Sequence, residues 1–184
     1  MPTFVSNLPV HVLVVHAVVV LVPLAVLGSI AVVLWPAARR RYGGLVIVVT
    51  AVATAFIPIA TSTGEGLEHS LPPTALISVH THLGDQLLPY VAGMLVLVTA
   101  FVALHQRGRS LARREGPGTT TAAAGLTGRP RLAAGMIAAL TVVLAVVSAV
   151  QVYHIGDAGA RAVWSNTQYV TSTHGQPPPD GNHG

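Results

Sequence analysis

The residues best suited to chemistry are two histidines at the start of the first long apolar run. His11 and His16 stand five residues apart, and neutral imidazole nitrogens are common ligands of haem iron, zinc and copper. Five residues on an ideal helix correspond to about 140° of rotation, so the two rings point in different directions. Because an unpaired imidazole within a membrane is costly, we expect His16 to face the interior of a helix bundle. His11 lies nearer the membrane boundary. It is expected to be either a hydrated interfacial residue or a supporting ligand.

A further candidate lies at the start of the third apolar run. His80 shares a helical face with Gly84 and Leu87, a stripe suited to packing inward. His82 shares its face with Asp85, so we expect His80 to be the inward ligand. Asp85 then either orients a histidine or is a surface charge.

The fourth apolar run ends on His154, three residues before Asp157. A histidine is electrostatically favoured at a helix C-terminus, so this position fits either a ligand or a structural residue. Arg161 is a candidate partner for a haem propionate, and Glu65 stands in the segment before the third run. The cofactor candidates are therefore His16, His80, His154, His11 and Arg161, and the candidates for a bare metal ion are His16, His80, Glu65, Asp85 and His154.

The composition indicates that membrane helices position these residues. Of the 184 residues, 52% are hydrophobic and only 9% are charged, well below the charged fraction of soluble domains. A spanning helix needs about 20 apolar residues, and four such runs are present. We predict an all-α integral membrane domain over residues 1–164, an up-down bundle of four helices. Their predicted ranges are 11–35, 45–63, 75–104 and 132–153.

The arginines predict the orientation of this bundle. Nine of the ten basic residues fall in residues 37–44 or in the linker 106–131, and all ten are arginine. Positive loops stay in the cytoplasm, so both termini and the candidate site are expected outside a bacterial plasma membrane. This topology accounts for the charge without nucleic acid, although a contact of the linker with anionic lipid is an alternative. Residues 165–184, rich in Pro and Gly, are expected to be disordered.

Several kinds of chemistry are excluded. The chain has no cysteine, which rules out disulfides, thiolate ligands, iron–sulfur ligation and covalent haem attachment. Phosphate loops, nucleophile elbows and His-Glu-x-x-His motifs are absent, so soluble enzyme classes drop out and an enzymatic activity is left undecided. The Glu-x-x-His pairs of di-iron bundles are absent too. Four options stay open: non-covalent haem b, a single zinc or copper ion, a proton-conducting cluster and a purely structural polar cap.

The opening stretch resembles a known family. Leu8-Pro9-Val10-His11, followed five residues later by His16, is similar to the Leu-Pro-x-His-x-x-x-x-His opening of the bacterial membrane proteins grouped as domain of unknown function 2231. The four-helix layout and the segment Val152-Tyr153-x-x-Gly156 are similar as well. Some members of the family are joined to Rieske-type iron–sulfur domains, and the family looks akin to membrane cytochromes. The resemblance therefore implies redox work.

The chain departs from that family at two positions. Val12 stands where many relatives have proline directly after the first histidine. Many relatives also place the histidine of the last helix one residue later, where this chain has Ile155. One residue turns a helical side chain by about 100°, so the departure bears directly on His154.

These observations predict a redox accessory protein that binds haem b or a metal ion, with a redox protein or quinone as its partner in the bilayer. The alternative is a structural or assembly subunit whose histidines only make interhelix hydrogen bonds. A transporter is less favoured, because it would carry polar residues through the full membrane depth. Below the histidines, the second and fourth runs offer only Thr50, Thr54, Thr141 and Ser148.

Overall fold

Four long helices make up nearly all of the chain that the structure describes. The structure is a computed structural model and describes residues 4–5, 8–68, 75–114 and 129–164. The strands β1 (Phe4–Val5) and β2 (Leu8–Pro9) pair antiparallel, with Phe4 opposite Pro9. The helices are α1 (Val10–Leu34), α2 (Pro36–Glu68), α3 (Ala75–Arg114) and α4 (Arg129–Trp164).

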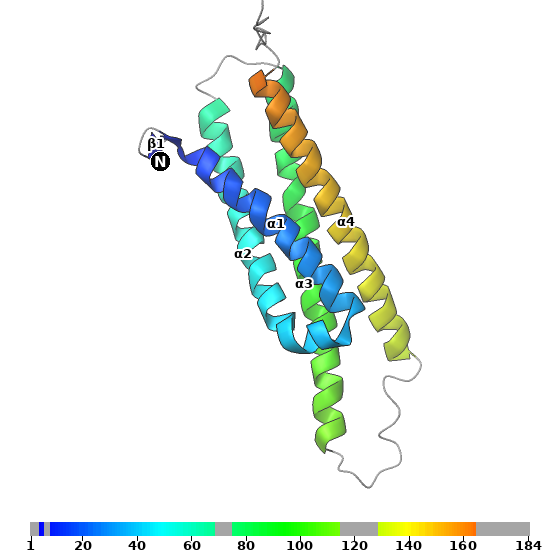
Figure 1. The fold of residues 1–184 in the computed structure, drawn as a ribbon. Helices are drawn as coiled ribbons and strands as arrows, with labels where there is room; N and C mark the ends of the chain where they lie inside the picture. Colours follow the sequence, from blue (N-terminus) through cyan, green and yellow to red (C-terminus); the bar gives the residue numbers. More distant parts are fainter. Residues whose placement is uncertain (1–3, 6–7, 69–74, 115–128, 165–184) are drawn as a thin grey trace, which may run out of the picture.

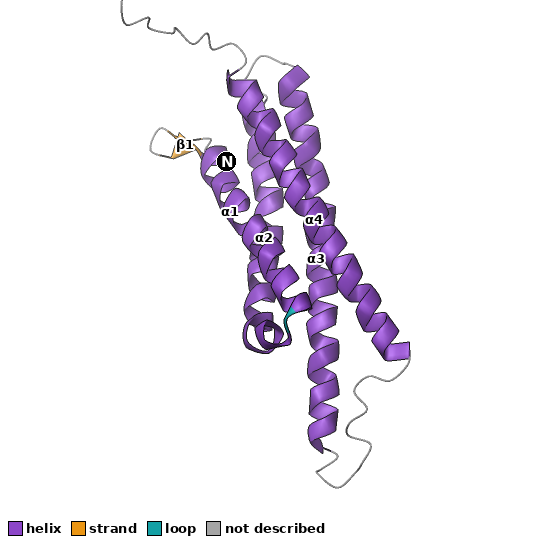
Figure 2. Cartoon of the chain, turned by 45° about the vertical axis from the view of Figure 1, so that its right-hand side comes forward, coloured by secondary structure: helices purple, strands orange, loops and turns teal. Residues whose placement is uncertain are grey.

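The helices pack as an up-down bundle, which confirms the predicted all-α class (Figure 1). The most extensive contacts lie within two hairpins, α1 with α2 and α3 with α4. The hairpins meet through α2 against α3 and α1 against α4, whereas α1 and α3 touch only slightly. Helices α1 and α3 are therefore diagonal partners across the interior, and Figure 2 shows α4 lying along α3 in the second view.

The outer surface of the bundle is apolar, and small side chains in its interior let the helices pack closely, as expected of helices in lipid. All four helices are long and apolar enough to cross a membrane. Large side chains such as Leu27, Val96 and Leu132 are exposed on the outer surface. The buried interior contains small residues such as Ala53 and Ala145, which allow the helix backbones to approach closely.

The turn between α1 and α2 is tighter than we predicted. Residues 37–44 were expected to form a loop, but α2 already begins at Pro36 and only Trp35 separates it from α1. Proline suits the first position of a helix, where its missing N–H costs nothing, and the alanines and arginines after it are good helix formers. Arg39 completes the turn by donating from Nε to the Val32 carbonyl at 3.0 Å and from Nη2 to the Val33 carbonyl at 2.9 Å.

The last two helices are also longer than predicted. Helix α3 continues to Arg114, into the predicted linker 106–131, and α4 runs from Arg129 past His154 to Trp164. Gly156 does not end α4, since a glycine weakens a packed helix without breaking it. Because α4 extends past it, His154 lies inside a helix, and its side chain points outward. The remainder of the linker and the predicted disordered tail at residues 165–184 lie outside the described residues.

Candidate functional site

The four helices line a partly open cavity of about 330 Å³ near the end of the bundle where α1 begins. We call this end, which carries His11 and His80, the histidine end. The wall is mostly apolar, with a few polar side chains from α1, α2 and α3. Its principal members are His11, Val15, Val18, Ile57, Ala60, Gly64, Glu65, His80, Gly84, Asp85, Leu87, Val152, Ile155 and Gly159.

His11 ties α1 to α2 at this cavity. Its Nδ1 lies 3.1 Å from the carbonyl oxygen of Ala60 and 3.3 Å from the hydroxyl of Thr63. A carbonyl can only accept, so Nδ1 carries the proton. The ring packs on Gly64, where an added Cβ would lie 2.9 Å from Cε1. The absence of a side chain at Gly64 is therefore what leaves room for the imidazole.

His80 ties α3 to α4 in the same way. Its Nδ1 lies 3.0 Å from the carbonyl oxygen of Ile155, and its ring packs on Gly159, where a Cβ would lie 3.1 Å from Cε1. In both hairpins the glycine comes four residues after the residue whose carbonyl accepts the hydrogen bond. The two hairpins thus build the same arrangement: a histidine, a helix carbonyl and a glycine one turn further along.

This arrangement fixes the chemistry of both rings. With the proton held on Nδ1 by a carbonyl, the neutral imidazole carries its lone pair on Nε2. A hydrogen bond from the other ring nitrogen to a carbonyl is also what orients most metal-ligating histidines. His11 and His80 come from the diagonal helices α1 and α3, and both line the cavity. They are therefore two oriented nitrogen donors at one interior space.

The carboxylates of the predicted site lie at the margin of the cavity. Glu65 on α2 and Asp85 on α3 contribute to its wall but are mostly exposed. In the part of the chain that the structure describes, no three His, Asp or Glu side chains are close enough together to hold a metal ion. The donor set at the cavity is therefore the histidine pair, with carboxylates at its edge.

Three other predicted site residues are not part of the cavity wall. His16 is exposed, contrary to the expectation that it faces inward, and its Nδ1 donates to the carbonyl of Val12 on its own helix at 2.6 Å. His154 is exposed beside the ring of Tyr153. Arg161 pairs with Asp157, with Nε 2.9 Å from Oδ2. A role of these three residues at a cofactor stays a prediction.

The placement of His16 and His154 follows from helical geometry. Since His11 takes the inward direction, a residue about 140° further round α1 points away from the interior. On α4 the inward position belongs to Ile155, which lines the cavity where the family resemblance expects a histidine. The shift of one residue to His154 turns the imidazole out of the cavity.

Sequence reasoning missed a buried polar residue next in the chain to the cavity wall. Gln151 on α4 is only 9% exposed, and its Nε2 donates to the carbonyl of Leu83 at 2.9 Å and lies 3.4 Å from Oε1 of Gln86. A single amide within an apolar run is a recognisable signal, because such a group needs a partner in lipid. The two glycines under the imidazoles carried no such signal.

Comparison with known proteins gives the family and no closer relative. Residues 7–172 match the family of predicted membrane proteins DUF2231. No curated protein matches the chain, and no solved structure matches it. The match covers all four helices and the histidine pair, so this multi-pass membrane protein belongs to the DUF2231 family.

Proposed function

We propose that the chain is a membrane redox accessory protein that binds haem b through His11 and His80. The observation that supports it is the pair of imidazoles on diagonal helices, each held by Nδ1 with Nε2 left as a donor at one apolar cavity. Bis-histidine ligation of haem by facing helices requires no more protein donors than these two. The geometry favours His11 over His16 as the ligand from α1.

The donor set suits haem better than a bare ion. A porphyrin supplies four nitrogens, so the protein need add only two axial ligands, whereas zinc takes four ligands and finds no cluster of three among the described residues. The apolar wall is also typical of cofactor sites. A porphyrin needs more room than about 330 Å³, so binding would include a separation of the two hairpins.

Haem in this position would supply one-electron chemistry. His11 and His80 would hold the iron through Nε2, the apolar wall would contact the macrocycle, and the carbonyls behind the imidazoles would tune the reduction potential. A quinol or a reduced redox protein would be the electron donor. Arg161 is the proposed partner of a propionate once its pairing with Asp157 is exchanged.

The test is an absorption spectrum of protein purified in mild detergent after expression with a haem precursor, before and after dithionite. We expect a Soret band and sharp reduced α and β bands from the wild type. His11→Ala and His80→Ala should each lose them, because one axial ligand is removed. His16→Ala and His154→Ala are the matched controls and should keep full occupancy. A colourless wild type, or equal spectra in all four variants, contradicts the proposal.

A structural role is the second candidate, because both histidines make interhelix hydrogen bonds. Such bonds contribute about 0.6 kcal/mol on average in membrane proteins. In that case the purified protein is colourless, and His11→Ala and His80→Ala lower the unfolding temperature while His16→Ala does not. The spectrum and the unfolding curve of the same samples therefore separate the two candidates.

A further inference from the structure

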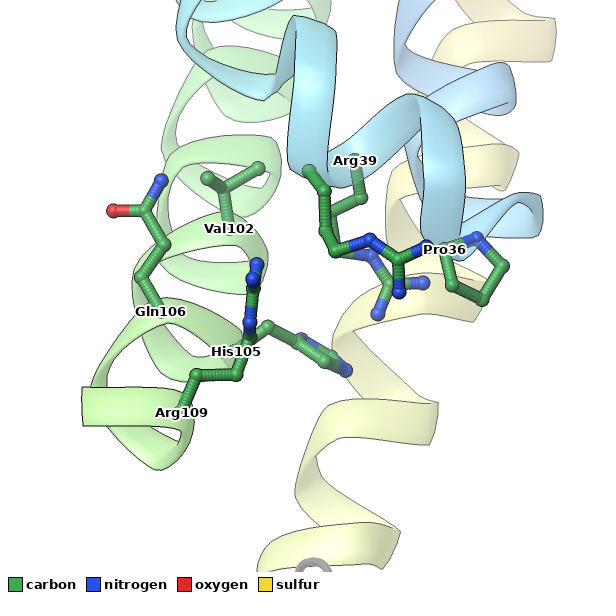
Figure 3. A pocket seen from close by; sticks show the side chains of 7 residues that line it. Pro36, Arg39, Val102, His105, Gln106 and Arg109 are labelled. Atoms are coloured by element: carbon green, nitrogen blue, oxygen red, sulfur yellow. The ribbon is translucent and has the colours of Figure 1, made fainter. Parts of the chain in front are cut away.

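A second pocket lies at the opposite end of the bundle, between the first turns of α2 and the last part of α3. It has a volume of about 140 Å³, and its polar wall consists of Arg39, Arg40, His105, Gln106 and Arg109. Figure 3 shows the side chains of Arg39 and Arg109 and the ring of His105 turned toward the same space. We call this end the arginine end.

Among the residues that the structure describes, the wall of this pocket concentrates basic side chains. Three arginines line it, and none of its described lining residues is acidic. The ion pair of Arg161 with Asp157 lies on the final turns of α4, on residues that do not line this pocket. Three neighbouring arginines repel one another, so an anion bound among them would lower the electrostatic repulsion between their charges.

One arginine is fixed, and the other two are available. Arg39 is held by its bonds to the carbonyls of Val32 and Val33, and its guanidinium carbon lies 4.4 Å from the centre of the Phe101 ring. Arg40 and Arg109 are exposed. A rigid guanidinium with two adaptable ones beside it suits a tetrahedral oxyanion, which accepts several N–H donors at once.

The backbone adds to this preference. Helix α2 begins at Pro36, which lines the pocket, so the positive end of the helix dipole lies beside it. The volume of about 140 Å³ is roughly that of four or five water molecules, enough for a phosphate group with some of its hydration.

The surroundings indicate that the phosphate belongs to a lipid. Trp35 and Tyr42 are exposed close to the pocket, and such aromatic residues gather where a membrane meets water. Leu34 and Leu45 are exposed beside them and provide an apolar surface for acyl chains. Exposed aromatic and apolar residues next in sequence to the pocket are what a site at the depth of lipid headgroups would have.

We propose that the pocket formed by Arg39, Arg40, His105 and Arg109 binds the headgroup phosphate of an anionic phospholipid. Basic pockets between membrane helices bind lipid headgroups in this way. The lipid would bridge α2 and α3 at the arginine end, and so link the two hairpins. The proposal does not depend on what binds at the histidine end.

The test compares lipid retention by native mass spectrometry of the full chain, using phosphatidylglycerol and phosphatidylcholine with identical acyl chains. We expect the wild type to retain phosphatidylglycerol about tenfold better, since each arginine near a headgroup contributes substantially. The double variant R40Q/R109Q should lose most of this preference. R107Q/R131Q, which removes two charges at the same end but outside the pocket wall, should keep it.

A second variant keeps the test decisive if the double variant folds poorly. Gln106→Glu retains every arginine but introduces a carboxylate into the pocket, and should also reduce the preference. Equal losses in R40Q/R109Q and R107Q/R131Q would attribute binding to general charge and overturn the site. Equal retention of the two lipids by the wild type would overturn it too. Displacement of the lipid by inorganic phosphate would reassign the pocket to a free anion.

Discussion

His11 and His16 have the same chemistry but different surroundings, and their positions on α1 decide between them. His11 reaches across to the carbonyl of Ala60, whereas His16 bonds to its own helix and is exposed. Burial cost alone favoured His16, because it lies deeper in the apolar run. Which histidine faces the interior is decided by the direction of the side chain and not by its depth in the apolar run. That direction follows from the packing of α2 against α1.

The glycines beneath the imidazoles give a prediction at this scale. Gly64→Ala should push the His11 ring off the Ala60 carbonyl, since the new Cβ would lie 2.9 Å from Cε1. Overpacking of this kind destabilises by about 1–3 kcal/mol. Gly159→Ala, with 3.1 Å to His80, should have a smaller effect.

Thermal unfolding in detergent measures both effects, and Gly156→Ala is the matched control. A Cβ at position 156 meets no atom within 4 Å, so this variant should be as stable as the wild type or slightly more so. If Gly64→Ala unfolds at the same temperature as Gly156→Ala, the ring is not held in the described position.

At the scale of the elements, hydrophobic runs predicted the existence of all four helices but not where they end. The runs reflect the thickness of the apolar layer, whereas α2, α3 and α4 continue beyond it through residues that helices tolerate in water. At the turn between α1 and α2, Arg39 donates to two carbonyls that α1 leaves unpaired at its end. An arginine read from the sequence only as a topology signal therefore also has a structural role.

The charge and the shape of Arg39 can be separated experimentally. Arg39→Lys keeps the positive charge but loses the planar fork that reaches both Val32 and Val33. We expect a loss of about 1.5–3 kcal/mol in unfolding free energy, the range for hydrogen bonds to charged groups. Arg41→Lys, at an exposed position, is the control for chemical unfolding in detergent. Equal stability of the two variants would contradict a structural role for Arg39.

At the scale of the whole molecule, the arginine clusters predict which end faces the cytoplasm. The chain lacks cysteine, so single cysteines can report on each end without background. In intact cells, a membrane-impermeant maleimide should label Ser62→Cys at the histidine end and spare Ser110→Cys until the cells are lysed. The reverse pattern would place the histidine end in the cytoplasm.

Which features could be predicted from the sequence depends on how far apart in the chain the interacting residues lie. Helix number and the inward face of His80 depend on patterns within one segment, and the structure agrees with both. The placement of His11 and His80 at one cavity, the partner of Gln151 and the pocket around Arg109 each depend on residues brought together by packing. Those relations are not encoded in local spacing, so a single sequence could not supply them.

The placement of the interhelix hydrogen bonds has a mechanical consequence. His11 joins α1 to α2 by a hydrogen bond, and His80 and Gln151 join α3 to α4, so each of these bonds lies within one hairpin. Where the hairpins meet, the described core consists largely of apolar side chains, and at the arginine end the guanidinium of Arg39 on α2 lies over the Phe101 ring of α3. A change in the spacing between the two hairpins would therefore move His11 relative to His80 without breaking the hydrogen bonds of either histidine within its own hairpin.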